Sequence, residues 1–174
     1  MTSLVEFESD LRKAAQESAE FLREKNARLN KSEEYDESYS GEREFVAELY
    51  MVLSLLNKDY IQNLSIDYYR YKKKERVVEY VFPDIVFHDS KKGRTAVEVK
   101  VVWFLQTRKD GLYKRDADRI TRDYKKLRDR YSKFDRKIML VAFLGSSEHY
   151  HRNNFKQYVE DLVHGNSNIS VITC

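Results

Sequence analysis

The chain has 174 residues, 41% of them hydrophobic, which is enough for one folded domain with a sizeable buried core. Charged residues make up 35% of the chain with a net charge of +3, and no apolar run approaches the roughly 20 residues of a membrane span. The single cysteine, Cys174, excludes internal disulfides and cysteine metal clusters. We therefore expect a cytoplasmic protein without membrane contacts.

Hydrophobic periodicity predicts an alternation of helices and strands. A helix comes first, and a polar, acidic linker joins it to a second helix. Three strand-like runs follow, then an amphipathic helix, a fully apolar strand, a further helix and a short last strand. In chain order these elements cover residues 4–29, 42–57, 66–72, 80–88, 95–104, 115–132, 137–145, 146–165 and 169–174.

This order of elements predicts an α/β fold. Three consecutive strands indicate a meander, and the helix at residues 115–132 would cross over to place the strand at 137–145 parallel beside one of them. We expect a mixed sheet with helices on both faces. We expect the N-terminal helix and acidic linker at residues 1–40 and the main folded domain at residues 41–174.

The charge is unevenly distributed. Residues 1–44 hold 12 acidic and seven basic side chains, a net charge of −5. Residues 108–133 hold 11 basic side chains and five aspartates, a net charge of +6. A basic segment of this kind suits a polyanion, because neutralising phosphates releases counterions. A solvated helix with mixed charges explains the segment equally well.

Three charged residues interrupt two strand-like runs. Asp84 follows the only proline of the chain, and Glu98 and Lys100 lie two residues apart on one face of the next strand. A hairpin between the two runs would bring both carboxylates together, where they repel each other unless a cation lies between them. Carboxylates and backbone carbonyls are the oxygen ligands that Mg²⁺ prefers, and a nearby lysine can orient or deprotonate a water or stabilise phosphoryl charge. A Glu/Lys pair on a solvent-facing strand is the alternative, but it does not explain Asp84.

Pro83-Asp84, followed after thirteen residues by Glu98-Val99-Lys100, resembles the signature of the PD-(D/E)xK nuclease superfamily. The resemblance implies a restriction-endonuclease-like core of helix, three-strand meander, helix and strand, here with an extra N-terminal helix and a C-terminal helix and strand. It also implies a Mg²⁺-dependent endodeoxyribonuclease, in which Mn²⁺ can substitute. Asp84, Glu98 and the carbonyl of Val99 would hold the metal, and Lys100 would serve the attacking water.

GEREFVAEL, GLYKRDADRI and KIMLVAFL together show a weaker similarity to archaeal Holliday-junction resolvases. The chain departs from that pattern in its first 40 residues, in a long insertion before Asp84 and in its last helix and strand. Restriction-type enzymes and virus- or plasmid-borne nucleases fit about as well. The substrate is thus expected to be duplex or branched DNA, cut by a homodimer. A nuclease-fold protein that only binds DNA or another protein is the alternative.

The superfamily usually adds an acidic residue from the helix after Gly41, and Glu42, Glu44 and Glu48 compete for this role. On a helical wheel Glu42 lies within the apolar stripe, Glu48 on its flank and Glu44 toward solvent. We therefore predict that Glu42 is catalytic and contacts the metal, through water if not directly, with Glu48 as the reserve. Glu42 at the helix start could instead simply stabilise the helix.

Seven basic residues are predicted to contact the nucleic acid. They come from the second helix, from the KKKER segment and from the basic segment: Arg43, Lys73, Lys114, Arg115, Arg119, Arg122 and Lys126.

Overall fold

The computed structural model describes residues 4–29, 40–60, 64–65, 69–73, 77–89, 93–104, 111–145 and 149–174. The described helices are α1 (Leu4–Leu29), α2 (Ser40–Leu56), α4 (Gly111–Arg130) and α5 (His149–Val163). The described strands are β1 (Leu64–Ser65), β2 (Tyr69–Lys73), β3 (Val77–Val81), β4 (Ile85–Asp89), β5 (Gly93–Phe104), β6 (Arg136–Gly145) and β7 (Ile169–Thr173). The predicted α/β class is confirmed. Most of the predicted acidic linker lies outside the described residues.

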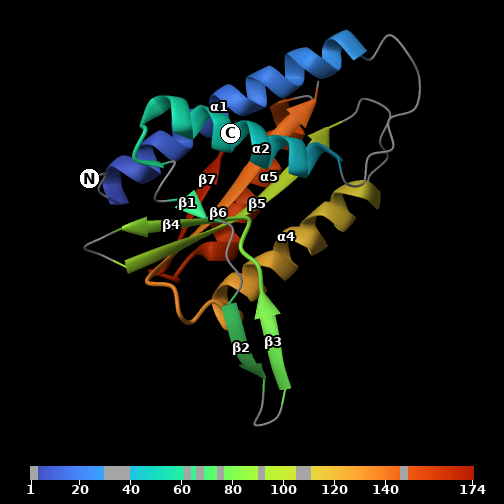
Figure 1. Cartoon of the computed structure of the whole chain (residues 1–174). Helices are drawn as coiled ribbons and strands as arrows, with labels where there is room; N and C mark the ends of the chain where they lie inside the picture. Colours follow the sequence, from blue (N-terminus) through green and yellow to red (C-terminus); the bar gives the residue numbers. More distant parts are fainter. Residues whose placement is uncertain are drawn as a thin grey trace.

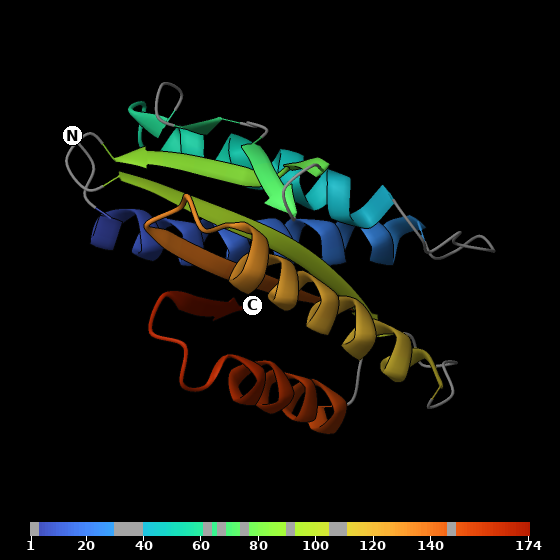
Figure 2. The same ribbon diagram turned by 90° about the horizontal axis from the view of Figure 1, so that it is seen from below.

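Five strands form one mixed sheet in the order β1–β4–β5–β6–β7. β4 is antiparallel to β5, whereas β5, β6 and β7 run parallel. α1 and α2 cover one face of the sheet and α4 and α5 cover the other (Figures 1 and 2). α4 connects β5 to β6, because parallel neighbours need a crossover connection. The predicted mixed sheet and the crossover helix are confirmed.

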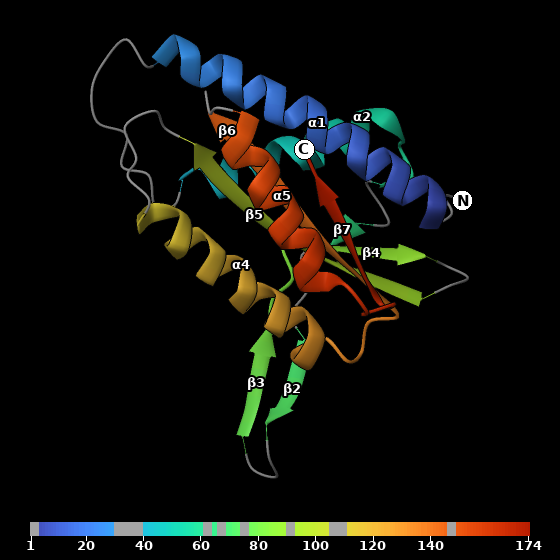
Figure 3. The same ribbon diagram turned by 180° about the vertical axis from the view of Figure 1, so that it is seen from behind.

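β5 separates two apolar cores by the alternation of its side chains. Val97, Val99 and Val101 pack with α1 and α2, in the core that also contains the buried side chains of α1. Ala96 and Val102 pack with α4 and α5, the two helices that lie nearest the viewer in Figure 3. Even-numbered residues of β5 therefore face α4, and any charged side chain among them is enclosed between the sheet and this helix.

The stretch YVFPDIVFH forms two strands, and the prediction of one continuous strand is wrong. β3 ends at Val81 and β4 begins at Ile85. Pro83 lies in the gap, because it has no N–H to donate to a neighbouring strand. Among the described strands, β2 and β3 pair with each other alone, and they form a ribbon that projects from the body of the molecule (Figures 1 and 3).

The predicted meander also has a different first strand. β1, and not the run at residues 66–72, pairs with β4 and completes the antiparallel half of the sheet. A two-residue strand carries too little periodicity to be recognised in a sequence. The β2–β3 ribbon is thus an insertion between the first and second strands of the meander.

α1 shares its core with α2 and the sheet. Its Phe7 ring stacks on Phe87 of β4 with centroids 4.1 Å apart, and Tyr60 donates a hydrogen bond of 2.7 Å to Asp10. The division of the chain at residue 40 stays a prediction. None of the described helices carries an apolar stretch long enough to cross a bilayer.

Candidate active site

Asp84 takes over a backbone hydrogen bond at the point where β4 is interrupted. The pairing of Ile85 with Val97 continues to place Pro83 opposite Val99. There the Asp84 carboxylate accepts, through Oδ2 at 2.7 Å, the Val99 N–H that a strand carbonyl would otherwise accept. This hydrogen bond explains why an aspartate follows the proline, although aspartate is unfavourable within a strand.

The Val99 carbonyl points to the same edge of β5 as the Val99 N–H that Asp84 accepts. The N–H and C=O groups of one strand residue point to the same edge, so both groups of Val99 face the side of Pro83. Because Pro83 has no N–H, it donates nothing to this carbonyl. The geometry is compatible with the predicted role of the Val99 carbonyl as an oxygen ligand.

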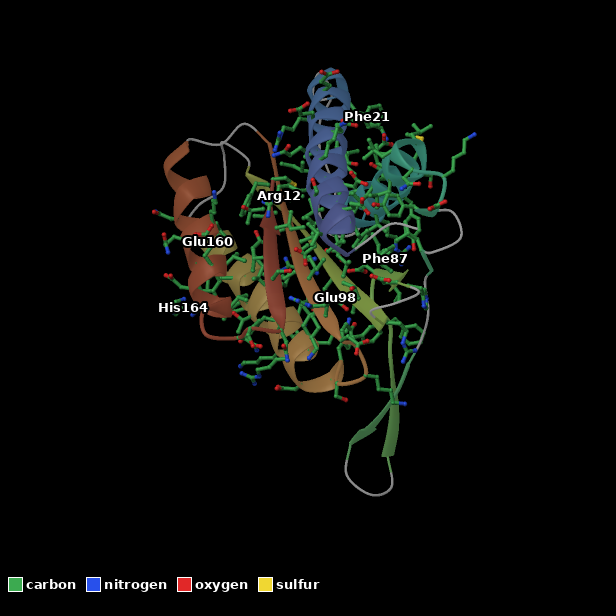
Figure 4. The ribbon with its side chains drawn as sticks, turned by 90° about the vertical axis from the view of Figure 1, so that its left-hand side faces the viewer. Arg12, Phe21, Phe87, Glu98, Glu160 and His164 are labelled. Carbon is green, nitrogen blue, oxygen red and sulfur yellow. The ribbon has the colours of Figure 1, made fainter. Side chains whose placement is uncertain are left out.

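The Glu98 side chain lies in the interior, between the sheet and α4, and only 5% of the residue is exposed. In Figure 4 it lies deep in the molecule, whereas Glu160 and His164 lie on the outer side of α5. Its Oε1 accepts a hydrogen bond of 2.7 Å from Lys126 and a second hydrogen bond from the Tyr131 hydroxyl. A buried carboxylate needs such partners, because leaving it unpaired is costly.

Each of the two carboxylates has one oxygen held by the protein. Oδ2 of Asp84 is held by Val99, and Oε1 of Glu98 by Lys126 and Tyr131. Within the described part of the chain, Oδ1 of Asp84 and Oε2 of Glu98 accept no hydrogen bond. Carboxylates that bind metals are usually oriented in this way, with one oxygen hydrogen-bonded and the other available to the ion.

Both carboxyl groups have raised pKa values. Burial raises the pKa of Asp84 to about 6, although the Val99 N–H opposes the shift. Burial, followed by repulsion from Asp84, raises the pKa of Glu98 to about 7, although Lys126 opposes it. The charge of Asp84 is among the causes that raise the pKa of Glu98, which indicates that the two carboxylates lie near each other.

These shifts predict how the stability of the protein without metal depends on pH. Between about pH 4 and 7 the folded protein binds protons at these groups more tightly than the unfolded chain does, so the free energy of unfolding falls as the pH rises. Each unit by which a pKa is raised on folding corresponds to a loss of about 1.4 kcal/mol over this range. Glu98→Gln removes one titrating group. We expect its free energy of unfolding in EDTA to increase relative to the wild type across this window, as measured by urea unfolding. A difference in unfolding free energy between Glu98→Gln and the wild type that does not change with pH would contradict the raised pKa of Glu98.

Lys100 lies between two other carboxylates. Its Nζ is 2.9 Å from Glu42 Oε2, on α2, and 2.8 Å from Asp123 Oδ2, on α4. Burial lowers the pKa of Lys100, but Glu42 and Asp123 together raise it by more, so its pKa lies above the ordinary value. The ammonium group is therefore charged at neutral pH. It can orient a water or stabilise negative charge. Because it already carries its proton, it is unsuited to deprotonate the water, which was the other role that the sequence allowed.

Of the three glutamates on α2, Glu42 is the one that contacts Lys100. Its carboxylate also lies 3.5 Å from Arg119 Nη2. Glu44 is more exposed and lies 3.5 Å from Lys25, and Glu48 is half-buried. The helical wheel thus identified the glutamate that faces the site. Its carboxylate meets two cations, and its charge raises the pKa of Asp84.

The basic residues predicted to contact nucleic acid fall into two groups. Lys126 and Arg119 are in ion pairs inside the site, with Glu98 and Glu42 respectively. The exposed side chains are Arg43 on α2 and Lys114, Arg115 and Arg122 on α4. Lys73 ends β2, and its side chain lies outside the described set.

Sequence reasoning missed two residues of the site, Asp123 and Tyr131. Tyr131 directly follows α4 and lies in the apolar core that this helix covers. Asp123 belongs to a second stripe of alternating charge at steps of three, four and three residues: Asp116, Arg119, Asp123 and Lys126. That spacing places all four on one helix face and was the available signal.

A divalent cation fits the donors that the site offers. Among the described residues no three Asp, Glu, His or Cys side chains gather closely enough to hold a metal by themselves. Mg²⁺ needs fewer, because it keeps several waters and is usually bound by one or two carboxylates. Asp84, Glu98 and the Val99 carbonyl are oxygen donors of this kind, and a cation between the two buried carboxylates would oppose the rise in their pKa values.

Comparison of the chain with protein-family models, curated proteins and solved structures found no match.

Proposed function

We propose that the protein is a divalent-metal-dependent endonuclease of the PD-(D/E)xK type that hydrolyses phosphodiester bonds in DNA. The observation that carries the proposal is the pair of Asp84 and Glu98. They meet beside a strand interruption, their pKa values are raised, and each has one oxygen held by the protein. The charged Lys100 lies on the same face of β5.

The order of elements supports a restriction-endonuclease-like core. α2 is followed by β1, β4 and β5, which form an antiparallel meander, and then by α4 and the parallel strand β6. The β2–β3 ribbon interrupts this order as an insertion. α1, α5 and β7 extend the core, at the places where the sequence predicted an extra N-terminal helix and a C-terminal helix and strand.

In the proposed reaction, Asp84, Glu98 and the Val99 carbonyl would hold the cation. A divalent cation supplies Lewis acidity toward a phosphoryl group and lowers the pKa of water. Lys100 remains an ammonium group and donates hydrogen bonds to the attacking water or to the charge that develops on the phosphate. Glu42 and Asp123 hold this ammonium group in place.

The proposal is tested by incubating the full chain with supercoiled plasmid, linear duplex, single-stranded DNA and a four-way junction. Each substrate is offered with Mg²⁺, Mn²⁺ or EDTA. We expect cleavage with either metal and none with EDTA. DNA binding without cleavage of any substrate would instead support the alternative, a nuclease-fold binding module.

The exposed basic residues of α4 are expected to bind phosphates. Replacing Lys114, Arg115 and Arg122 together with alanine removes three exposed charges without touching the ion pairs inside the site. Since each phosphate contact contributes about 0.9 to the slope of log K against log salt, the slope for duplex binding should fall by roughly two to three. Fluorescence anisotropy at several salt concentrations measures it.

A matched variant carries alanine at Arg12, Lys13 and Lys156, which are exposed basic residues on α1 and α5. It loses the same charge away from the site. Its salt slope should stay close to that of the wild type, and equal losses in the two variants would show that the α4 surface has no special role.

A further inference from the structure

Two side chains hold the same oxygen of Glu98, and they differ in what they contribute. The Tyr131 hydroxyl donates to Oε1 from a side chain that is 1% exposed and fixed in the core. Lys126 donates to the same oxygen at 2.7 Å, and 28% of its side chain is exposed. Tyr131 is sufficient to orient the carboxylate, so the distinct contribution of Lys126 is its positive charge.

The Lys126 ammonium group also lies near the segment that carries Asp84. Its Nζ is 3.4 Å from the carbonyl oxygen of Phe82, two residues before Asp84, and 5.5 Å from the centre of the Tyr131 ring. Its charge acts on both Glu98 and Asp84. In the protein without metal, Lys126 thus occupies the electrostatic position that a cation would fill.

We propose that Lys126 is a built-in counter-ion of Glu98 that competes with the divalent cation for this carboxylate. The inference depends on the proposed function, since it assigns the cation to Asp84 and Glu98. Two positive groups beside one carboxylate repel each other, so binding of the metal weakens the contact with Lys126. The partly exposed lysine side chain can move into solvent, whereas Tyr131 stays in place. Lys126 therefore lowers the metal affinity of the site.

The test measures Mg²⁺ binding by isothermal titration calorimetry, without nucleic acid, at about pH 9 so that Glu98 is ionised in every variant. Lys126→Gln keeps a hydrogen-bond donor but removes the charge. A unit charge a few ångströms away changes the cation affinity of a carboxylate by about tenfold or more, so Lys126→Gln should bind Mg²⁺ roughly tenfold more tightly than the wild type.

Three further variants separate charge from position. Lys126→Arg keeps the charge, and Lys125→Gln removes the same charge from the exposed neighbouring residue, so both should bind Mg²⁺ like the wild type. Tyr131→Phe removes the orienting donor without a change in charge. Loss of such a supporting contact typically costs 10- to 100-fold in metal affinity, so this variant should bind Mg²⁺ more weakly.

Unchanged or weaker Mg²⁺ binding by Lys126→Gln would overturn the inference and make Lys126 a positioning residue like Tyr131. If Asp84→Asn abolishes Mg²⁺ binding while Lys126→Gln leaves it unchanged, the metal site stands and only the competition fails. If neither the wild type nor Lys126→Gln binds Mg²⁺, the metal site and the inference fail together.

Discussion

Asp84→Asn is expected to abolish DNA cleavage and to stabilise the protein without metal. Asparagine can still accept the Val99 N–H, so the interruption of β4 keeps its local geometry. The charge that would hold the cation is lost, and Lewis-acid stabilisation of several kcal/mol corresponds to a fall in cleavage rate of about 10³-fold or more. Single-turnover cleavage of the preferred substrate measures it.

The stability of the same variant changes in the opposite direction. Asp84 has a pKa of about 6, so above that pH its charge destabilises the fold when no metal is bound. Removing the charge should raise the melting temperature in EDTA by about 5 °C at pH 7.5. Asp118→Asn, an exposed aspartate of α4, is the control for both measurements and should change neither. Full activity of Asp84→Asn would remove Asp84 from the catalytic site.

A gain in stability together with a loss of activity distinguishes a functional carboxylate from a structural one. A carboxylate that holds the fold together has a lowered pKa, and its loss destabilises the protein. Asp84 and Glu98 have raised pKa values. Their burial is unfavourable for the protein alone, which is the behaviour expected of groups retained to bind a cation.

The main strands of the site could be predicted because their side chains alternate strictly. Val97, Val99 and Val101 on one face imply that Glu98 and Lys100 share the other, and the structure has this arrangement. The turn between the two runs implied the antiparallel pairing of β4 with β5. A pattern of period two is informative here, since one face of β5 is apolar from Val97 to Val101.

The interruption of β4 and the identity of the first strand of the meander could not be predicted in the same way. Both depend on which strands pair, and pairing is a long-range property that one short run does not encode. Pro83 was the local signal for a break. It was interpreted as an unusual residue within a strand, although proline favours a strand boundary.

The ion pairs of Lys126 and Arg119 could not be predicted from the sequence for a different reason. Lys126 and Arg119 were predicted to contact phosphate because a basic helix surface suits a polyanion. Whether a lysine of α4 faces solvent or the sheet depends on the rotation of the helix. The apolar stripe of Ile120, Tyr124 and Leu127 fixes that rotation and places Lys126 at its border. Side chains at such a border can reach inward, and here Lys126 and Arg119 do.

Glu42 is the other residue whose substitution is expected to have a large effect on the rate of cleavage. It lies in the first turn of α2 and faces Lys100, which lies beyond the part of β5 that pairs with β4. Its carboxylate is 2.9 Å from the Lys100 ammonium group, which Asp123 holds from the other side at 2.8 Å. Two carboxylates from different helices therefore fix the direction of one lysine side chain.

Glu42→Gln should lower the rate of cleavage by roughly 10²-fold, because Lys100 loses one of the two groups that position it. DNA affinity should be retained or increased, since a negative charge is removed beside the site, and single-turnover rates with anisotropy titrations separate the two effects. Glu44→Gln removes the same charge from a more exposed position near Lys25 and should cleave like the wild type. If Glu48→Gln is inactive while Glu42→Gln still cleaves, the carboxylate that serves the reaction is Glu48, and the contact between Glu42 and Lys100 is structural.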